Sequence, residues 1–145
     1  MIALLQRVSE AKVTVDGEIT GQIGRGLLVL LAVEPDDSDK TVARMVERVS
    51  TYRVFPDPEG RMNRSLVDDG LDLLVVPQFT LAADTKKGTR ASFTKAAPPE
   101  MGRDYFERFV GRCRETLKVV ETGVFGADMK VSLVNDGPVT FWLEA

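Results

Sequence analysis

At 145 residues, the chain is expected to form one domain over residues 1–145, long enough to keep a core without disulfides. It has no histidine and one cysteine, Cys113, which excludes an internal disulfide, histidine-based zinc sites and nucleophiles activated by histidine. Only carboxylates stay open as metal ligands, and we expect no metal and no cofactor. Twenty-two acidic against nineteen basic side chains leave a net charge of −3, which argues against broad binding of a polyanion, and no DNA partner is expected.

The N-terminus lacks the basic and apolar regions of a leader, and no run reaches the roughly 18 apolar residues of a membrane span. We therefore expect a cytoplasmic protein without membrane contact. Four cations, Lys86, Lys87, Arg90 and Lys95, lie within ten residues of one another. They are either a local patch for one end of an RNA or a solvated loop, and composition favours neither.

The first half of the chain predicts an antiparallel meander, a buried strand and a helix. Asp16-Gly17 is a hairpin turn, and the seven apolar residues from Leu27 to Val33 are typical of a central strand buried on both faces. A helix should begin at Asp37 or Ser38 and run to about Thr51. The expected strands are residues 2–8, 11–15, 18–23, 27–33 and 52–55.

The second half predicts a buried strand over residues 73–76 that ends at Pro77, because proline cannot donate to a ladder. Residues 82–97 form a long polar loop, and Pro98-Pro99 suits the start of a helix that runs to Leu117. Residues 65–72 are ambiguous. A short strand is expected over residues 119–123, and a hairpin or tight strand connection over residues 132–143.

Two polar stretches are the candidates for chemistry. Gln78-Phe79-Thr80 follows a strand end, where ligands often collect; its amide, hydroxyl and backbone N–H groups could hold an oxyanion beside the Phe79 ring. The second stretch, Asn135-Asp136-Gly137-Pro138, leaves backbone carbonyls free to face a ligand, because Pro138 fixes its own φ and has no N–H. From these residues alone, the favoured interpretations are the ordinary ones, a strand whose polar residues face water for the first stretch and a simple turn for the second.

Read together, Val75-Val76-Pro77-Gln78-Phe79-Thr80-Leu81 and Asn135-Asp136-Gly137-Pro138-Val139-Thr140 resemble the two signatures of the D-aminoacyl-tRNA deacylases, Ser-Gln-Phe-Thr and Asn-x-Gly-Pro-Val-Thr. The resemblance extends from Ile2 through Gly26 to Leu31 and on to Trp142. It implies a mixed α/β fold of largely antiparallel, barrel-like sheet layers with two main helices, in a homodimer. The implied reaction is hydrolysis of D-aminoacyl-tRNA, and of glycine mischarged on tRNA(Ala), as chiral proofreading in translation.

The resemblance also implies residue roles. Gln78, Phe79 and Thr80 would hold the ester, with an N–H of Phe79 or Thr80 toward the oxyanion and the tRNA ribose hydroxyl assisting the attack. The step Gly137-Pro138, cis in that family, would enter the partner subunit's pocket and reject L-amino acids. Arg7 would brace this step. Phe125 and Met129 would line the pocket of the terminal adenosine; without the resemblance they would be plain core residues.

This chain departs from the family at Pro77, where the signature has serine. The exchange deletes a hydroxyl and a backbone donor, and we expect activity to persist because the remaining roles are backbone-mediated. Two alternatives stay open: a small-molecule esterase with Thr80 as its nucleophile, and a non-catalytic RNA- or nucleotide-binding dimer. Cys113 is interpreted as an inert core thiol, because no activating group lies near it in the sequence.

Overall fold

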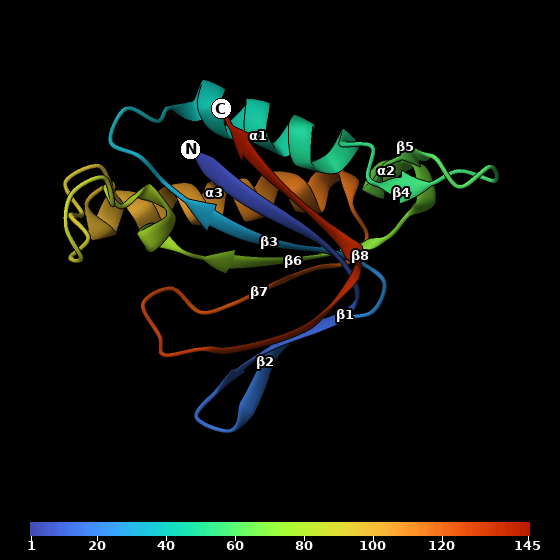
Figure 1. Ribbon diagram of the computed structural model, residues 1–145, viewed down its shortest axis with the longest axis horizontal. Helices are drawn as coiled ribbons and strands as arrows, with labels where there is room; N and C mark the ends of the chain where they lie inside the picture. Colours follow the sequence, from blue (N-terminus) through green and yellow to red (C-terminus); the bar gives the residue numbers. More distant parts are fainter.

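The computed structural model describes residues 1–145, with strands and helices in a mixed order (Figure 1). The helices are α1 (Asp39–Thr51), α2 (Leu66–Asp69) and α3 (Pro99–Thr116), and η1 (Phe79–Ala82) is a short 3-10 turn. The strands are β1 (Ile2–Val15), β2 (Glu18–Ile23), β3 (Gly26–Ala32), β4 (Phe55–Pro56), β5 (Met62–Arg64), β6 (Asp72–Pro77), β7 (Val120–Thr122) and β8 (Lys130–Glu144).

The main sheet has the strand order β2-β1-β3-β6-β7, and β8 pairs with β1 as well. Pairs that involve β1 are antiparallel, whereas β3–β6 and β6–β7 are parallel. The long strands β1 and β8 bend, so the sheet curls toward a barrel, with α1 and α3 together on one side (Figure 1). This arrangement confirms the predicted mixed α/β fold with a largely antiparallel, barrel-like sheet and two main helices.

The two faces of the sheet bury two separate cores, because successive side chains of a strand point to opposite faces. In β3, Leu27 and Val29 pack in the larger cluster beneath the helices, whereas Leu28 packs in a smaller cluster inside the curl. In β6, Leu73 and Leu74 divide in the same way. The prediction that residues 27–33 are buried on both faces is therefore confirmed.

The helix predictions agree with the structure. Ser38 is the N-cap of α1, and the expected apolar stripe faces the core, with Val42, Met45 and Val49 fully buried. Pro98 precedes α3, whose buried residues include Phe106 and Phe109. The ambiguous residues 65–72 contain α2, which Ser65 caps. None of these helices combines the length and the hydrophobicity that crossing a membrane requires.

Three strand predictions were wrong. Residues 2–15 form the single strand β1 rather than two, and the strand expected over residues 52–55 is reduced to Phe55–Pro56. Residues 132–143 are not a hairpin: β8 continues through them, and both halves pair with β1, Ser132 with Lys12 and Thr140 with Gln6. The turn-forming residues between the halves make a bulge instead of a reversal, because β1 is long enough to pair on both sides of it.

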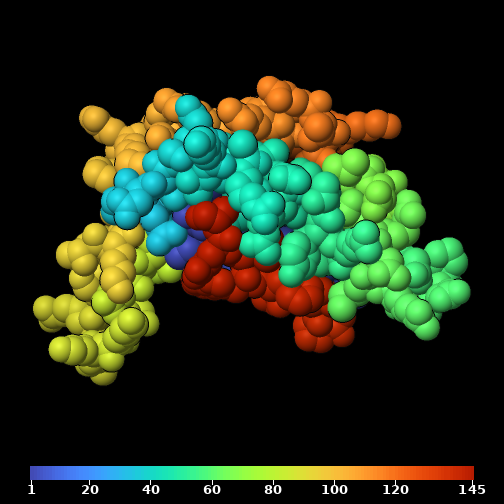
Figure 2. All heavy atoms as spheres, turned by 90° about the horizontal axis from the view of Figure 1, so that it is seen from above, coloured from blue at the N-terminus to red at the C-terminus, as the bar shows by residue number.

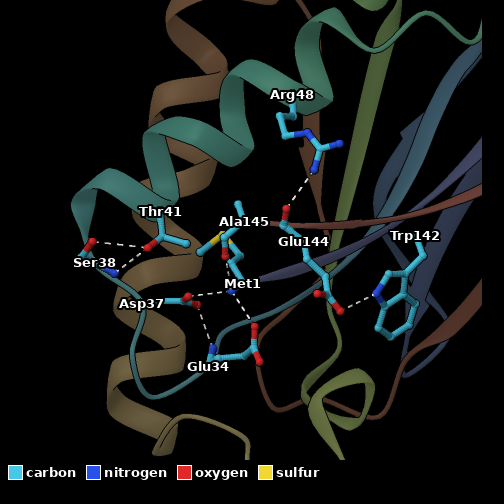
Figure 3. A network of polar contacts seen from close by, with 9 residues as sticks. All are labelled: Met1, Glu34, Asp37, Ser38, Thr41, Arg48, Trp142, Glu144 and Ala145. Carbon is cyan, nitrogen blue, oxygen red and sulfur yellow. Dashed lines mark hydrogen bonds and ion pairs between the residues drawn. The ribbon is translucent and has the colours of Figure 1, made fainter.

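Polar contacts tie the two ends of the chain to α1 and to the loop before it (Figure 3). The Met1 ammonium donates to Glu34 Oε1 at 2.7 Å and to Asp37 Oδ1 at 2.6 Å. The amide of Ala145 donates to the Met1 carbonyl at 3.0 Å, and Arg48 donates to the Glu144 carbonyl at 2.9 Å. The ends of β1 and β8 are therefore held against α1.

Candidate active site

The carboxyl end of β6 places Gln78 beside β3. Amides of successive residues along β6 face opposite neighbours. Gln78 N, just past the strand, donates to the Leu31 carbonyl of β3 at 2.8 Å, and Leu73 N donates to the Val119 carbonyl just before β7, at 3.0 Å. By this alternation the nitrogen of Pro77 faces the β7 side. The β6–β7 pairing ends at Val75 and Thr122, with one further bond from Gly123 N to the Val75 carbonyl, so the ladder stops at Pro77, which has no N–H to continue it.

The turn η1 follows at once and presents the predicted catalytic residues. Leu81 N donates to the Gln78 carbonyl at 3.2 Å and Ala83 N to the Thr80 carbonyl at 3.1 Å, so the amides of Phe79 and Thr80 precede the first hydrogen bond of the turn. The side chain of Gln78 hydrogen-bonds Thr80 Oγ1. This amide is the only hydrogen-bond partner of the Thr80 hydroxyl, and an amide cannot serve as a general base.

A cavity of about 260 Å³ opens beside this turn, between the strand ends and the start of α3. It brings together Gln78, Phe79 and Phe125 of the predicted site, but neither Thr80 nor Met129 lines it. The full lining is Leu31, Val33, Pro77, Gln78, Phe79, Ala97, Pro99, Gly102, Phe106, Phe125 and Gly126. An apolar cavity edged by one amide side chain suits a flat, largely apolar ligand group.

Phe125 is held against α3 by two neighbours that the sequence did not single out. A Cβ on Gly102 would lie 3.4 Å from the Phe125 ring, so the glycine lets the ring approach the helix closely. The Arg103 guanidinium lies over the ring, 5.0 Å from its centroid. No sequence pattern indicated this contact, because it joins α3 to a turn more than twenty residues further along the chain.

Met129 lies behind the cavity rather than on its wall. Its sulfur accepts a hydrogen bond from Val124 N at 3.4 Å, and the side chain packs against the core inside the curl. A Cβ on Gly123 would come within 2.8 Å of this sulfur. Met129 therefore contacts the segment that leads to Phe125, and not the space that Phe125 lines.

The second motif forms the bulge of β8. Opposite Arg7 of β1, four residues of β8, Asp136 to Val139, lie between the pairs Gln6–Thr140 and Val8–Asn135. The Gly137–Pro138 peptide bond is cis, as the resemblance implies. Gly137 has a φ of +147°, and a Cβ there would lie 2.7 Å from Val139 Cγ2, so only glycine fits.

Two side chains hold the bulge in shape. Arg7 Nε donates to the Asp136 carbonyl at 2.8 Å, while its Nη1 donates to the Val54 carbonyl at 2.7 Å. Asn135 closes the other side: its Oδ1 accepts from Val139 N at 2.7 Å, and its Nδ2 donates to Thr140 Oγ1 at 2.9 Å. The resemblance indicated the role of Arg7. The role of Asn135 in closing the bulge was missed, although this residue begins the motif.

Within one chain the two motifs do not meet. Arg7 lies opposite the bulge and pairs with Leu27 of β3, and Leu27 pairs with Leu73 of β6. Gln78 comes five residues after Leu73, just past the end of β6, and β8 is three strands away from β6. With strands about 4.8 Å apart and a rise of about 3.3 Å per residue, the separation measured along the sheet is roughly 20 Å. Both Gly137 and Pro138 are exposed.

Cys113 takes no part in this site. It is fully buried in the larger core, and burial raises the pKa of its thiol to about 12. A thiol of that pKa is protonated at neutral pH and is a poor nucleophile. The interpretation of Cys113 as an inert core residue therefore agrees with its surroundings.

Comparison with known proteins places these features in a family. The family model described as "D-Tyr-tRNA(Tyr) deacylase" matches residues 4–144. A D-aminoacyl-tRNA deacylase of Alkalilimnicola ehrlichii is 60% identical over 145 residues, which are 100% of this chain and 97% of the relative. One of Escherichia coli is 57% identical over 144 residues, covering 99% of each chain.

Two solved structures share the fold. One, titled "c-Myc DNA Unwinding Element Binding Protein", superposes with a TM-score of 0.95 at 39% identity and covers 100% of this chain and 99% of its own. The other, titled as a probable eukaryotic D-amino acid tRNA deacylase, has a TM-score of 0.88 at 20% identity, with 99% and 98% covered, and shows the fold alone. On the family model and the relatives above, the chain belongs to the D-Tyr-tRNA(Tyr) deacylase family.

Proposed function

We propose that this protein hydrolyses the ester that joins a D-amino acid, or glycine mischarged on tRNA(Ala), to the 3′ end of a tRNA, and releases the free amino acid and the tRNA. The observation that carries the proposal is the identity of 57–60% to curated D-aminoacyl-tRNA deacylases over nearly the whole chain. The cavity beside Gln78 and Phe79 supports it, because its size and apolar wall suit a nucleoside.

In the proposed mechanism the site positions the ester and stabilises charge. An aminoacyl ester is already activated, so orientation and donors to the oxyanion can supply the remaining acceleration. The terminal adenosine lies against Phe125, Gln78 holds the ester, and the amide of Phe79 or Thr80 faces the oxyanion. The neighbouring ribose hydroxyl of the tRNA assists the attack. Met129 acts from behind, by positioning the segment that leads to Phe125.

Selectivity comes from the bulge of a second copy. The carbonyls of Gly137 and Pro138 face the substrate α-carbon and leave no room for an L side chain, which rejects the wrong isomer by a clash. The separation of roughly 20 Å between the bulge and Gln78 in one chain supports a site shared between two subunits. A two-fold dimer would complete two such sites at once.

The test is hydrolysis of D-tyrosyl-tRNA and L-tyrosyl-tRNA by the purified protein with a chelator present. We expect cleavage of the D ester alone. Equal cleavage of both esters would exclude the filter and favour the small-molecule esterase that uses Thr80. Binding of the aminoacyl-tRNA without turnover would instead identify a non-catalytic RNA-binding dimer.

A further inference from the structure

The loop between η1 and α3 has a defined shape. Asp84 and Ser92 exchange backbone hydrogen bonds of 2.8 and 3.0 Å, and the Asp84 carboxylate accepts from Lys86 N at 3.0 Å. Lys95 Nζ lies 3.3 Å from the same carboxylate. Residues 84–95, here called the basic loop, project from the body of the molecule (Figure 2, yellow-green to yellow). Their cations are therefore presented on a loop closed by internal hydrogen bonds.

The basic loop extends the aromatic wall of the cavity. The rings of Phe93 and Phe79 have centroids 5.3 Å apart and planes tilted by 57°. Phe79 lines the cavity, whereas Phe93 lies outside it, and the two are 55% and 49% exposed. Exposed neighbouring aromatic rings at the mouth of a cavity indicate a binding surface rather than core packing.

Charge on this loop opposes the charge of the whole chain. The loop carries one acidic residue, Asp84, against four cations, Lys86, Lys87, Arg90 and Lys95, in a protein whose net charge is −3. Asp84 pairs with Lys95, and the other three cations make no ion pair. Three unpaired cations on the same loop as the exposed Phe93 ring match the way proteins bind single-stranded nucleic acid, in which bases stack on rings and cations follow the phosphates.

We propose that the basic loop binds the single-stranded 3′ end of the tRNA next to the terminal adenosine. Phe93 stacks on a base that follows the adenosine out of the cavity, and Lys86, Lys87 and Arg90 contact the phosphates. This inference rests on the proposed function and deepens it, because it assigns the nucleotides beyond the ester to a surface of their own. Of the two interpretations that composition left open for these cations, it favours the local patch for one end of an RNA over the solvated loop.

The experiment compares D-tyrosyl-tRNA with the D-tyrosyl ester of adenosine, which has neither phosphates nor further bases. Phe93→Ala and the triple variant K86Q/K87Q/R90Q should each lower kcat/KM for the tRNA about tenfold, mainly through KM. Both should leave hydrolysis of the adenosine ester unchanged. Phe93→Tyr should retain activity on the tRNA and Phe93→Leu should not. The triple variant should also reduce the salt dependence of KM, by a slope of about 0.7 for each phosphate that is no longer neutralised.

The matched control is K40Q/R112Q/K118Q, which removes three exposed and unpaired cations on α1, late in α3 and in the loop after α3. This control should leave kcat/KM unchanged for both substrates.

The inference would be overturned if Phe93→Ala and K86Q/K87Q/R90Q lost activity equally on both substrates, or lost none on either. It would also be overturned if light scattering showed that Phe93→Ala no longer forms a dimer. If the natural protein hydrolyses neither substrate, the proposed function fails. The inference is then decided by binding of a 5′-phosphorylated CCA trinucleotide, which Phe93→Ala should weaken relative to adenosine.

Discussion

Arg7 and Asp136, 129 positions apart in sequence, are joined by a hydrogen bond of 2.8 Å from the guanidinium Nε to the Asp136 carbonyl. Because Nη1 of the same guanidinium donates to the Val54 carbonyl, one rigid planar group fixes the bulge of β8 relative to the segment before β4. The bulge that carries Gly137 and Pro138 is therefore positioned by β1 and not by its own turn residues alone.

Arg7→Ala should lower both the kcat/KM for D-tyrosyl-tRNA and the ratio of D to L hydrolysis, each about tenfold, since a hydrogen bond from a charged group contributes about 1.5 kcal/mol or more. Arg7→Lys should recover part of the loss, because one ammonium cannot donate to two carbonyls in the fork geometry. Arg61→Ala is the control, as that guanidinium is exposed and makes no hydrogen bond. An unchanged D-to-L ratio in Arg7→Ala would show that the brace does not serve selectivity.

Thr80→Ala should retain most of the activity, within about threefold, because the hydroxyl of Thr80 hydrogen-bonds only the Gln78 amide and has no base beside it. Single-turnover hydrolysis of D-tyrosyl-tRNA measures this directly, with Thr116→Ala at the exposed end of α3, away from the site, as the control. A dead Thr80→Ala enzyme with a normal fold would instead assign the nucleophile to Thr80.

Pro77→Ser should change kcat/KM for D-tyrosyl-tRNA by no more than about threefold. The physical reason is that the hydrogen bond from Gln78 N to the Leu31 carbonyl and the bonds within η1 hold the predicted catalytic residues, and none of these bonds uses the nitrogen of residue 77. The measurement is steady-state hydrolysis of D-tyrosyl-tRNA by the natural protein and by Pro77→Ser. Background activity in the natural protein, restored by Pro77→Ser, would show that the serine hydroxyl is needed.

Alkaline pH should destabilise the protein through Cys113. Its thiol pKa is raised from 9.0 to about 12 by burial, so the unfolded chain loses this proton first as the pH rises. The stabilisation is complete below pH 9 and is lost between pH 9 and 12, with a slope of about 1.4 kcal/mol per pH unit. Urea unfolding of the natural protein and of Cys113→Ala across this range should show the two free energies of unfolding converging. If the free energies of unfolding of the two proteins instead fell in parallel with pH, Cys113 would not be the group responsible.

Asp37→Asn should lower the free energy of unfolding by about 1–3 kcal/mol, because the 5% exposed carboxylate accepts from both the Met1 ammonium and Glu34 N. The adjacent Asp36→Asn is the control, since Asp36 is exposed and makes no ion pair. Urea midpoints at pH 7 measure both. Equal midpoints for the two variants would show that the contacts around Met1 contribute nothing to stability.

Sequence by itself determined the elements whose pattern is local. The seven apolar residues from Leu27 to Val33 predicted the central strand, and Asp16-Gly17 the first hairpin, in which Val15 pairs with Glu18. The stripe through Val42, Met45 and Val49 predicted the buried face of α1. Each of these patterns is set by residues near one another in the chain, so no distant partner was needed to interpret it.

Only the tertiary structure decided what the turn formers around Gly137 do. The same residues suit a hairpin and a bulge, and the choice depends on whether a neighbouring strand is long enough to pair on both sides, as β1 is. Likewise, Met129 lies behind Gly123 rather than in the cavity, and Phe93 beside Phe79, through contacts between separate elements. Such contacts are set by how strands and helices pack together, which a local pattern of residues does not encode.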